Sequence, residues 1–189
     1  MGRRQESGVR SQELKAGLHL KLLTPDSCLP SPTPPCTSFS LNQKFPPNTG
    51  NVARLCAATR STLHLIEPLG FSLDDTQLKR AGMDYWQHLE WHRWQNWAAF
   101  TSQLSPGAQL WLIESGGPCL YTEAKFGLAD FLVFGRETAG LPKTLLEENR
   151  DCWLRIPMFN PDARSLNLSN CVALVLFEAL RQQGFPPET

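Results

Sequence analysis

Residues 162–170 read Asp-Ala-Arg-Ser-Leu-Asn-Leu-Ser-Asn, and they lead straight into an apolar pattern with helical spacing. The apolar positions follow the i, i+3, i+4, i+7 rule of a helix with one buried face: Leu168, Cys171, Val172, Val175, Leu176, Ala179 and Leu180. Small polar side chains before and within the first turn can accept hydrogen bonds from its free N–H groups: Ser165, Asn167, Ser169 and Asn170. Such a loop either caps the helix or also holds a polar or charged ligand, and this stretch alone leaves both interpretations open.

Upstream of this helix, short apolar runs alternate with helical patterns. The sequence predicts strands at 39–41, 63–67, 110–113, 131–134 and 152–156, and helices at 52–59, 76–81, 91–104 and 141–149. This alternation predicts an α/β domain with a mostly parallel sheet flanked by helices. Ligands of such sheets gather at the loops that leave the carboxyl ends of the strands. The polar loops at 46–51, 115–118, 135–140 and 157–167 are therefore the candidate site.

The first 36 residues differ from the rest of the chain. Seven of the 15 prolines fall between Pro25 and Pro47, and the run Ser-Pro-Thr-Pro-Pro at 31–35 excludes a helix or a central strand there. We expect residues 1–36 to be a disordered Pro/Ser-rich extension and residues 37–189 to form a single domain. A transit peptide, or a start placed too far upstream, are the alternatives for the extension.

Composition sets limits on partners and compartment. Lys and Arg together number 18, as do Asp and Glu, so only a local basic patch could favour a nucleic acid. No apolar run reaches the ~20 residues of a membrane span. The six cysteines contain no C-x-x-C pair, which argues against a zinc site; we expect Cys56 and Cys171 to be small buried side chains in a reducing, cytoplasmic compartment.

Familiar catalytic motifs are missing from the sequence. No G-x-G-x-x-G follows a predicted strand, and neither a P-loop nor a G-x-S-x-G elbow occurs. The four histidines lie away from the candidate loops, so an ordinary histidine acid–base site is not expected. The remaining groups are amides and hydroxyls together with Arg54, which suits a phosphate or carboxylate, and Glu137. Taken alone, Arg54 could instead form a surface salt bridge, and Glu137 could simply be solvated; both alternatives to a role in ligand binding stay open.

Three segments carry a resemblance. Asn48-Thr-Gly-Asn-Val-Ala-Arg54, Phe134-Gly-Arg-Glu-Thr-Ala-Gly140 and Ile156-Pro-Met with Ser165-Leu-Asn-Leu-Ser-Asn170 resemble, in the same order, the motifs of the SPOUT class of RNA methyltransferases. Ile66-Glu-Pro-Leu-Gly-Phe71 and Arg80-Ala-Gly-Met-Asp-Tyr85 narrow the likeness to the small TrmL/YibK-like enzymes. The resemblance covers about residues 39–185.

The resemblance implies a fold and an activity. It implies a C-terminal trefoil knot, a homodimer with the active site near the interface, and S-adenosylmethionine as cofactor with no metal. It implies methyl transfer to the ribose 2′-hydroxyl of the wobble nucleotide, position 34, of certain tRNAs, with no DNA or membrane partner. By matching position, Ile113, Gly135, Ile156 and Ser165 line the cofactor site, while Arg54, Glu137, Ser165, Asn167 and Asn48 serve catalysis and substrate positioning.

Two points stay open at this level. An arginine base is awkward because its pKa exceeds ~12, so Arg54 can equally orient the nucleotide or stabilise developing alkoxide charge. The segment before the first motif, residues 37–45, is a feeble strand compared with the apolar run of the family. A non-catalytic RNA-binding relative with a damaged first strand is therefore the alternative function.

Overall fold

The described part of the computed structural model comprises residues 36–40, 46–69, 86–136, 139–163, 165–185 and 187. The chain divides into two units, Met1–Ser31 and Pro32–Thr189, and all described residues belong to the second. The predictions for residues 1–35, for a helix at 76–81 and for Glu137 lie outside the described residues.

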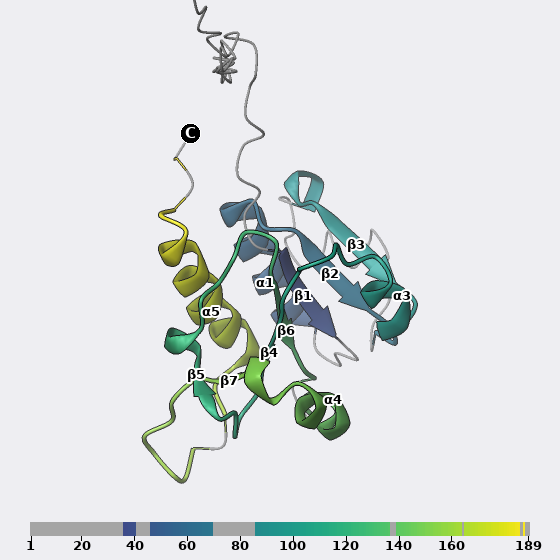
Figure 1. The fold of residues 1–189 in the computed structure, drawn as a ribbon. Coiled ribbons are helices and arrows are strands. Elements are labelled where there is room, and N and C mark those ends of the chain that lie inside the picture. Colours follow the sequence, from purple (N-terminus) through teal and green to yellow (C-terminus); the bar gives the residue numbers. More distant parts are fainter. Residues whose placement is uncertain are drawn as a thin grey trace, which may run out of the picture. The chain divides into compact units, whose positions relative to one another are not determined.

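Short apolar runs form a parallel sheet in this second unit (Figure 1). Its strands are β1 (Cys36–Ser40), β2 (Leu63–Ile66), β3 (Trp91–Trp94), β4 (Leu110–Ile113), β5 (Cys119–Leu120), β6 (Phe131–Phe134) and β7 (Trp153–Arg155). They lie in the order β3-β2-β1-β6-β4-β7-β5, and each neighbouring pair is parallel. The predicted α/β class with a parallel sheet is confirmed, while β3 and β5 were not foreseen.

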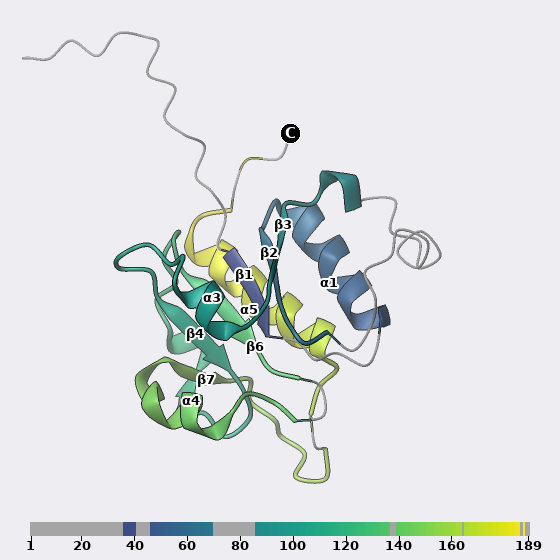
Figure 2. The same cartoon turned by 90° about the vertical axis from the view of Figure 1, so that its right-hand side faces the viewer.

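Alternation along the strands gives the sheet two buried faces. Leu65 and Leu132 pack with α1 (Pro46–Thr59) and α5 (Leu168–Gln182) in one core. Val133 packs on the opposite face with Leu146 of α4 (Lys143–Glu148) and Trp97 of α3 (Trp97–Thr101). Figure 2 shows α1 and α3 on opposite sides of β1 and β2. Burial on both faces explains why these strands read as continuous apolar runs.

The predicted C-terminal helix forms as α5. Its buried positions are the apolar side chains expected from the spacing: Val172, Val175, Leu176, Ala179 and Leu180. Each fully buried Val or Leu contributes on the order of 1.5–3 kcal/mol. Cys56 of α1 is buried in the same core, as expected, whereas Cys171 is only half-buried.

Helix α1 begins earlier than predicted. Residues 46–51 were expected to form a turn before a helix at 52–59, but the helix starts at Pro46 and runs without a break to Thr59. The reason is positional, because a proline in the first helical turn gives up an N–H group that has no partner within the helix anyway. The segment with Asn48 is thus helical, and the turn prediction is wrong.

The predicted aromatic helix at 91–104 is also wrong. Its first part is strand β3, which pairs in parallel with β2, and only Trp97–Thr101 is helical. Aromatic side chains suit a pleated surface, and the free edge of β2 supplies a hydrogen-bonding partner for the segment, so tertiary pairing overrides the helical pattern. Asn96 follows the strand and caps α3 by accepting a hydrogen bond from the backbone N–H of Ala99 at 2.8 Å.

Smaller differences concern the ends of elements and the first strand. Helix α4 starts at Lys143, so Pro142 occupies the N-cap rather than the first turn. The weak first strand is present as β1, which begins at Cys36 and pairs with both β2 and β6. In the described ranges, no helix has the length and apolar character needed to cross a membrane.

A cluster of aromatic rings surrounds His64 on the face of the sheet that α3 covers. Phe100 and Phe131 lie with their ring centroids 5.5 and 5.6 Å from the imidazole, and His92 stacks on it at 5.1 Å. Trp94 Nε1 donates a hydrogen bond to His64 Nδ1 at 3.0 Å, whereas Nε2 is buried without a partner among the described residues. His64 thus has a hydrogen-bond partner at only one of its two ring nitrogens among the described residues.

Acidification should destabilise the fold through His64. Burial, and secondarily the nearby His92, lowers its pKa from 6.5 to about 4. Between these values the unfolded chain binds a proton that the folded chain does not, so stability falls as the pH drops from 6.5 towards 4, by up to roughly 3 kcal/mol. Urea unfolding between pH 4 and 7 should show a shallower pH dependence for His64→Leu than for the wild type. An unchanged slope would contradict the assignment, and exposed His88→Gln is the control.

Candidate functional site

A cavity of about 110 Å³ lies beyond the carboxyl ends of β4, β6 and β7, next to the start of α5. Parallel pairing aligns these ends, since Ile113 is in register with both Phe134 and Leu154. Four segments build the wall: Ile113, Glu114 and Ser115 at the end of β4; Phe134, Gly135 and Arg136 at the end of β6; Ile156 and Met158 after β7; and Ser165, Leu166, Leu168 and Cys171 around the start of α5. These segments match three of the four loops predicted to gather at this edge.

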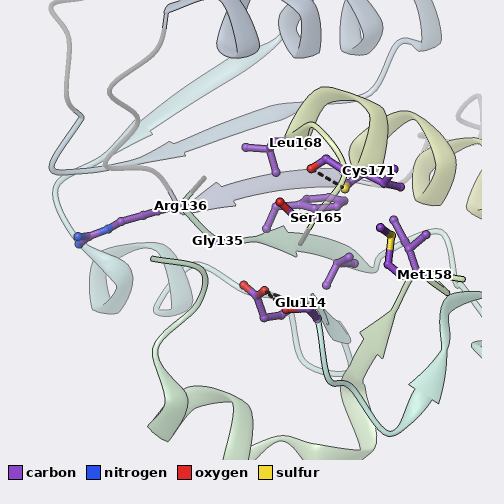
Figure 3. Close-up of a pocket in the computed structure, with 12 residues that line it drawn as sticks. Glu114, Gly135, Arg136, Met158, Ser165, Leu168 and Cys171 are labelled. Carbon is purple, nitrogen blue, oxygen red and sulfur yellow. Dashed lines mark hydrogen bonds between the residues drawn. The ribbon is translucent and has the colours of Figure 1, made fainter. Parts of the chain in front are cut away.

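The walls of the cavity are mixed in chemistry. Apolar side chains dominate, while Glu114, Ser115 and Ser165 add polar groups. In Figure 3, Glu114 lies below the end of β6 and Ser165 and Cys171 above it, while the side chain of Arg136 points away from the cavity. Burial raises the pKa of the Cys171 thiol, which keeps it protonated and poorly nucleophilic at neutral pH.

Asn167 connects the start of α5 to α1. Its Oδ1 accepts hydrogen bonds from the Ser169 backbone N–H at 2.9 Å and from Ser169 Oγ at 2.6 Å, so it is the N-cap of the helix. Its Nδ2 donates to Oδ1 of buried Asn48 at 3.0 Å. Two motif residues 119 positions apart in sequence are thus in direct contact.

Replacing Asn167 should therefore destabilise the fold in two separable parts. Asn167→Ala removes the cap, worth about 1 kcal/mol, and leaves buried Asn48 without this donor, which adds about 1–3 kcal/mol. Asn167→Ser keeps a capping oxygen but does not reach Asn48, so we expect a smaller loss. Urea unfolding measures both variants, and Asn170→Ala, exposed in the same turn, is the control. A loss for Asn167→Ala no larger than that of the control would contradict the two-part role.

Close backbone packing shapes the β6 side of the cavity. Arg136 and Gly140 exchange two backbone hydrogen bonds, N to O at 3.2 Å and 2.8 Å, and so close the loop between them. A Cβ on Gly135 would lie 2.2 Å from the carbonyl carbon of Gly140 and 2.3 Å from the backbone nitrogen of Leu141. Only glycine fits at this position, because the atoms in the way belong to the backbone.

The structure brings together some of the predicted site residues. Ile113, Gly135, Ile156 and Ser165, the four residues expected at the cofactor, all line the cavity. Asn48 and Asn167 contact each other beside it. Arg54 does not line the cavity: it is exposed on α1, and six residues of helix place it about 9 Å along the axis from Asn48.

Sequence reasoning missed other residues of the wall. Glu114, Met158, Leu168 and Cys171 line the cavity although none was named as a site residue, and of these only Met158 lies in a loop predicted to form the site. A signal existed for Glu114, which directly follows the apolar run of β4, where parallel sheets place ligands. As expected, His64, His88 and His92 lie outside the cavity wall. Within the described ranges, no cluster of His, Cys, Asp and Glu is arranged to hold a metal ion.

A parallel sheet flanked by helices, with a partly apolar cavity at the carboxyl ends of its strands, defines a ligand-binding α/β domain. The model of the SpoU rRNA Methylase family matches residues 40–177, so the chain belongs to that family. The chain is 50% identical, over 145 residues, to a tRNA (cytidine(34)-2'-O)-methyltransferase of Saccharophagus degradans, an alignment that covers 75% of this chain and 92% of that protein.

Solved structures agree with this membership. One, described as giving insight into the 2-OH methylation of C/U34 on tRNA, is 40% identical with a TM-score of 0.75 and covers 81% of this chain and 98% of the other. An rRNA methyltransferase from Sinorhizobium meliloti with bound AdoMet is 25% identical, with a TM-score of 0.68 over 78% of this chain and 56% of that one. The resemblance to TrmL/YibK-like enzymes is thereby confirmed.

Proposed function

We propose that this chain transfers a methyl group from S-adenosylmethionine to the ribose 2′-hydroxyl of the wobble nucleotide, position 34, a cytidine or modified uridine, of certain tRNAs. The observation that carries the proposal is the likeness, along nearly the whole domain, to relatives named for this reaction. The cavity supports it, because the four positions that the family resemblance implies at the cofactor all line it.

The residues of the cavity suit the proposed cofactor. Ile113, Ile156 and Leu168 offer an apolar surface for an adenine ring, and Ser165 offers a hydroxyl for a polar group of the ligand. Bound S-adenosylmethionine supplies an activated methyl group, so the task of the protein is to bind, orient and exclude water. No metal is part of the proposal.

The proposed catalytic set comprises Arg54, Glu137, Ser165, Asn167 and Asn48. The contact between Asn167 and Asn48 holds the start of α5 against the start of α1, so these amides organise the site rather than exchange protons. Arg54 is the group we assign to the substrate: its guanidinium orients a phosphate or stabilises developing charge on the 2′-oxygen. Glu137 and Ser165 position the substrate and cofactor.

The proposal includes a knotted homodimer in the cytoplasm, with the C-terminal segment threaded through a loop. Exposed apolar side chains on α5, Leu174 at 43% and Phe177 at 48%, support the dimer, because a second copy would cover them. Exposed Arg136 and Lys143 offer positive charge to the RNA backbone. Arg155 instead donates from Nη1 to the backbone oxygens of Gly117 and Pro118 at 2.7 and 2.6 Å, so its guanidinium is already engaged.

Methyl transfer to total tRNA, followed by mapping of the modified nucleotide, tests the proposal. We expect a 2′-O-methyl group at position 34, and no transfer to a tRNA that carries a 2′-deoxynucleotide there. Binding of tRNA without turnover would support the non-catalytic alternative instead. The premise of that alternative is weakened by β1, which pairs on both sides within the sheet.

A further inference from the structure

Glu114 is the first residue after β4, and its carboxylate is held on both oxygens. Oε1 accepts hydrogen bonds from the backbone N–H of Ser115 at 2.9 Å and from Ser115 Oγ at 3.1 Å. Oε2 accepts one from the backbone N–H of Leu141 at 3.0 Å. Three donors from two separate segments therefore converge on this carboxylate. Its side chain lines the cavity (Figure 3).

The backbone of Glu114 is also fixed. Its N–H donates to the Leu154 carbonyl at 3.0 Å, and its own carbonyl accepts from Trp153 Nε1 at 3.2 Å. Both partners belong to β7, so the residue is anchored to the sheet before its side chain reaches across to Leu141. Because the backbone is anchored in this way, the carboxylate is held in one position and does not behave as a mobile surface charge.

The Glu114 carboxylate contacts the loop that forms the β6 side of the cavity. Leu141 is buried and directly follows Gly140, which closes that loop onto Arg136. Gly140 has a φ of +64°, and a Cβ there would lie 2.2 Å from Glu114 Oε2. The Glu114 carboxylate thus occupies the space that a side chain at position 140 would otherwise fill. Its contact with Leu141 sets the distance between the cavity wall at the end of β4 and the wall at the end of β6.

We propose that Glu114 is a positioning residue for the cofactor cavity, tying the wall after β4 to the wall after β6. The role rests on the proposed function, since it assumes that this cavity binds S-adenosylmethionine. This positioning role requires both side-chain oxygens to accept hydrogen bonds, because each of them faces at least one N–H donor. A glutamine of the same size places an amide NH₂ group against one of these donors and breaks the tie.

Isothermal titration calorimetry with S-adenosylhomocysteine tests this role on the full chain. We expect Glu114→Gln to bind about tenfold more weakly or worse, with an affinity for tRNA that matches the wild type. A merely structural role would lower both affinities together. Glu147→Gln, an exposed carboxylate on α4, is the matched control and should bind like the wild type.

The outcomes separate this inference from the function on which it rests. A wild-type chain that does not bind S-adenosylhomocysteine overturns the proposed function. A wild type that binds, with Glu114→Gln equally tight, overturns the positioning role alone. If Glu114→Gln does not fold, Glu114→Asp replaces it: this variant keeps both acceptors one methylene short of Leu141, and binding as tight as in the wild type overturns the role.

Discussion

Gly135→Ala is expected to weaken the binding of S-adenosylhomocysteine by about 100-fold. The new Cβ would lie 2.2 Å from the Gly140 carbonyl carbon, 2.7 Å from its Cα and 2.3 Å from the Leu141 nitrogen, all backbone atoms. No side-chain rotation relieves these contacts, so the loop between Arg136 and Gly140 must move by nearly 1 Å. A shift of that size in a wall of the site is enough for a loss of about 100-fold, with roughly 1–3 kcal/mol of strain in the fold.

A second glycine serves as a control that distinguishes the effect of a clash at the cavity wall from the effect of general backbone strain. Gly107 has a φ of +89° and nothing within 4 Å of an added Cβ, so Gly107→Ala introduces strain without a clash. We expect it to lower the unfolding midpoint slightly and to leave cofactor affinity intact. Calorimetry and thermal unfolding on both variants make the comparison. Cofactor binding by Gly135→Ala as tight as by the wild type would show that this wall does not shape the site.

Arg54→Ala is expected to lower the rate of methyl transfer by at least about 100-fold, the loss seen when a donor to a developing negative charge is removed. Cofactor affinity should stay within about twofold of the wild type, because Arg54 is exposed on α1 and is not part of the cavity wall. The expected pattern is a fall in kcat with unchanged binding of S-adenosylhomocysteine. Single-turnover transfer to tRNA, alongside calorimetry, measures the two quantities separately.

Two further variants define what Arg54 contributes. Arg54→Lys keeps the charge but loses the planar fork of donors, so a partial recovery would assign the role to charge and a failure to recover would assign it to bidentate geometry. Arg60→Ala, an exposed arginine at the end of the same helix, is the control for loss of a positive charge from this region. Normal turnover of Arg54→Ala would remove the residue from the mechanism.

Sequence reasoning was most successful where a segment carries its own structural signal. The run Phe131–Phe134 is apolar throughout because both of its faces are buried, and it is a strand as predicted. Helix α5 begins with Asn167 as its N-cap, as the polar stretch before the apolar pattern indicated. The predictions failed where the deciding partner is distant in sequence: Trp91–Trp94 becomes a strand because β2 offers it an edge.

The sequence by itself determined the class of fold and the helix that follows Asn167, because local periodicity and capping chemistry are properties of consecutive residues. The four positions expected at the cofactor, which line the cavity, came instead from the resemblance of its motifs to a known family. Only the tertiary structure decided that Asn167 contacts Asn48 and that Glu114 reaches Leu141. Those contacts depend on the order of strands in the sheet and on backbone spacing at Gly135 and Gly140. The stretch at 162–170 thus encodes a helix cap on its own, and it becomes one wall of a binding site only when β4, β6 and β7 end beside it.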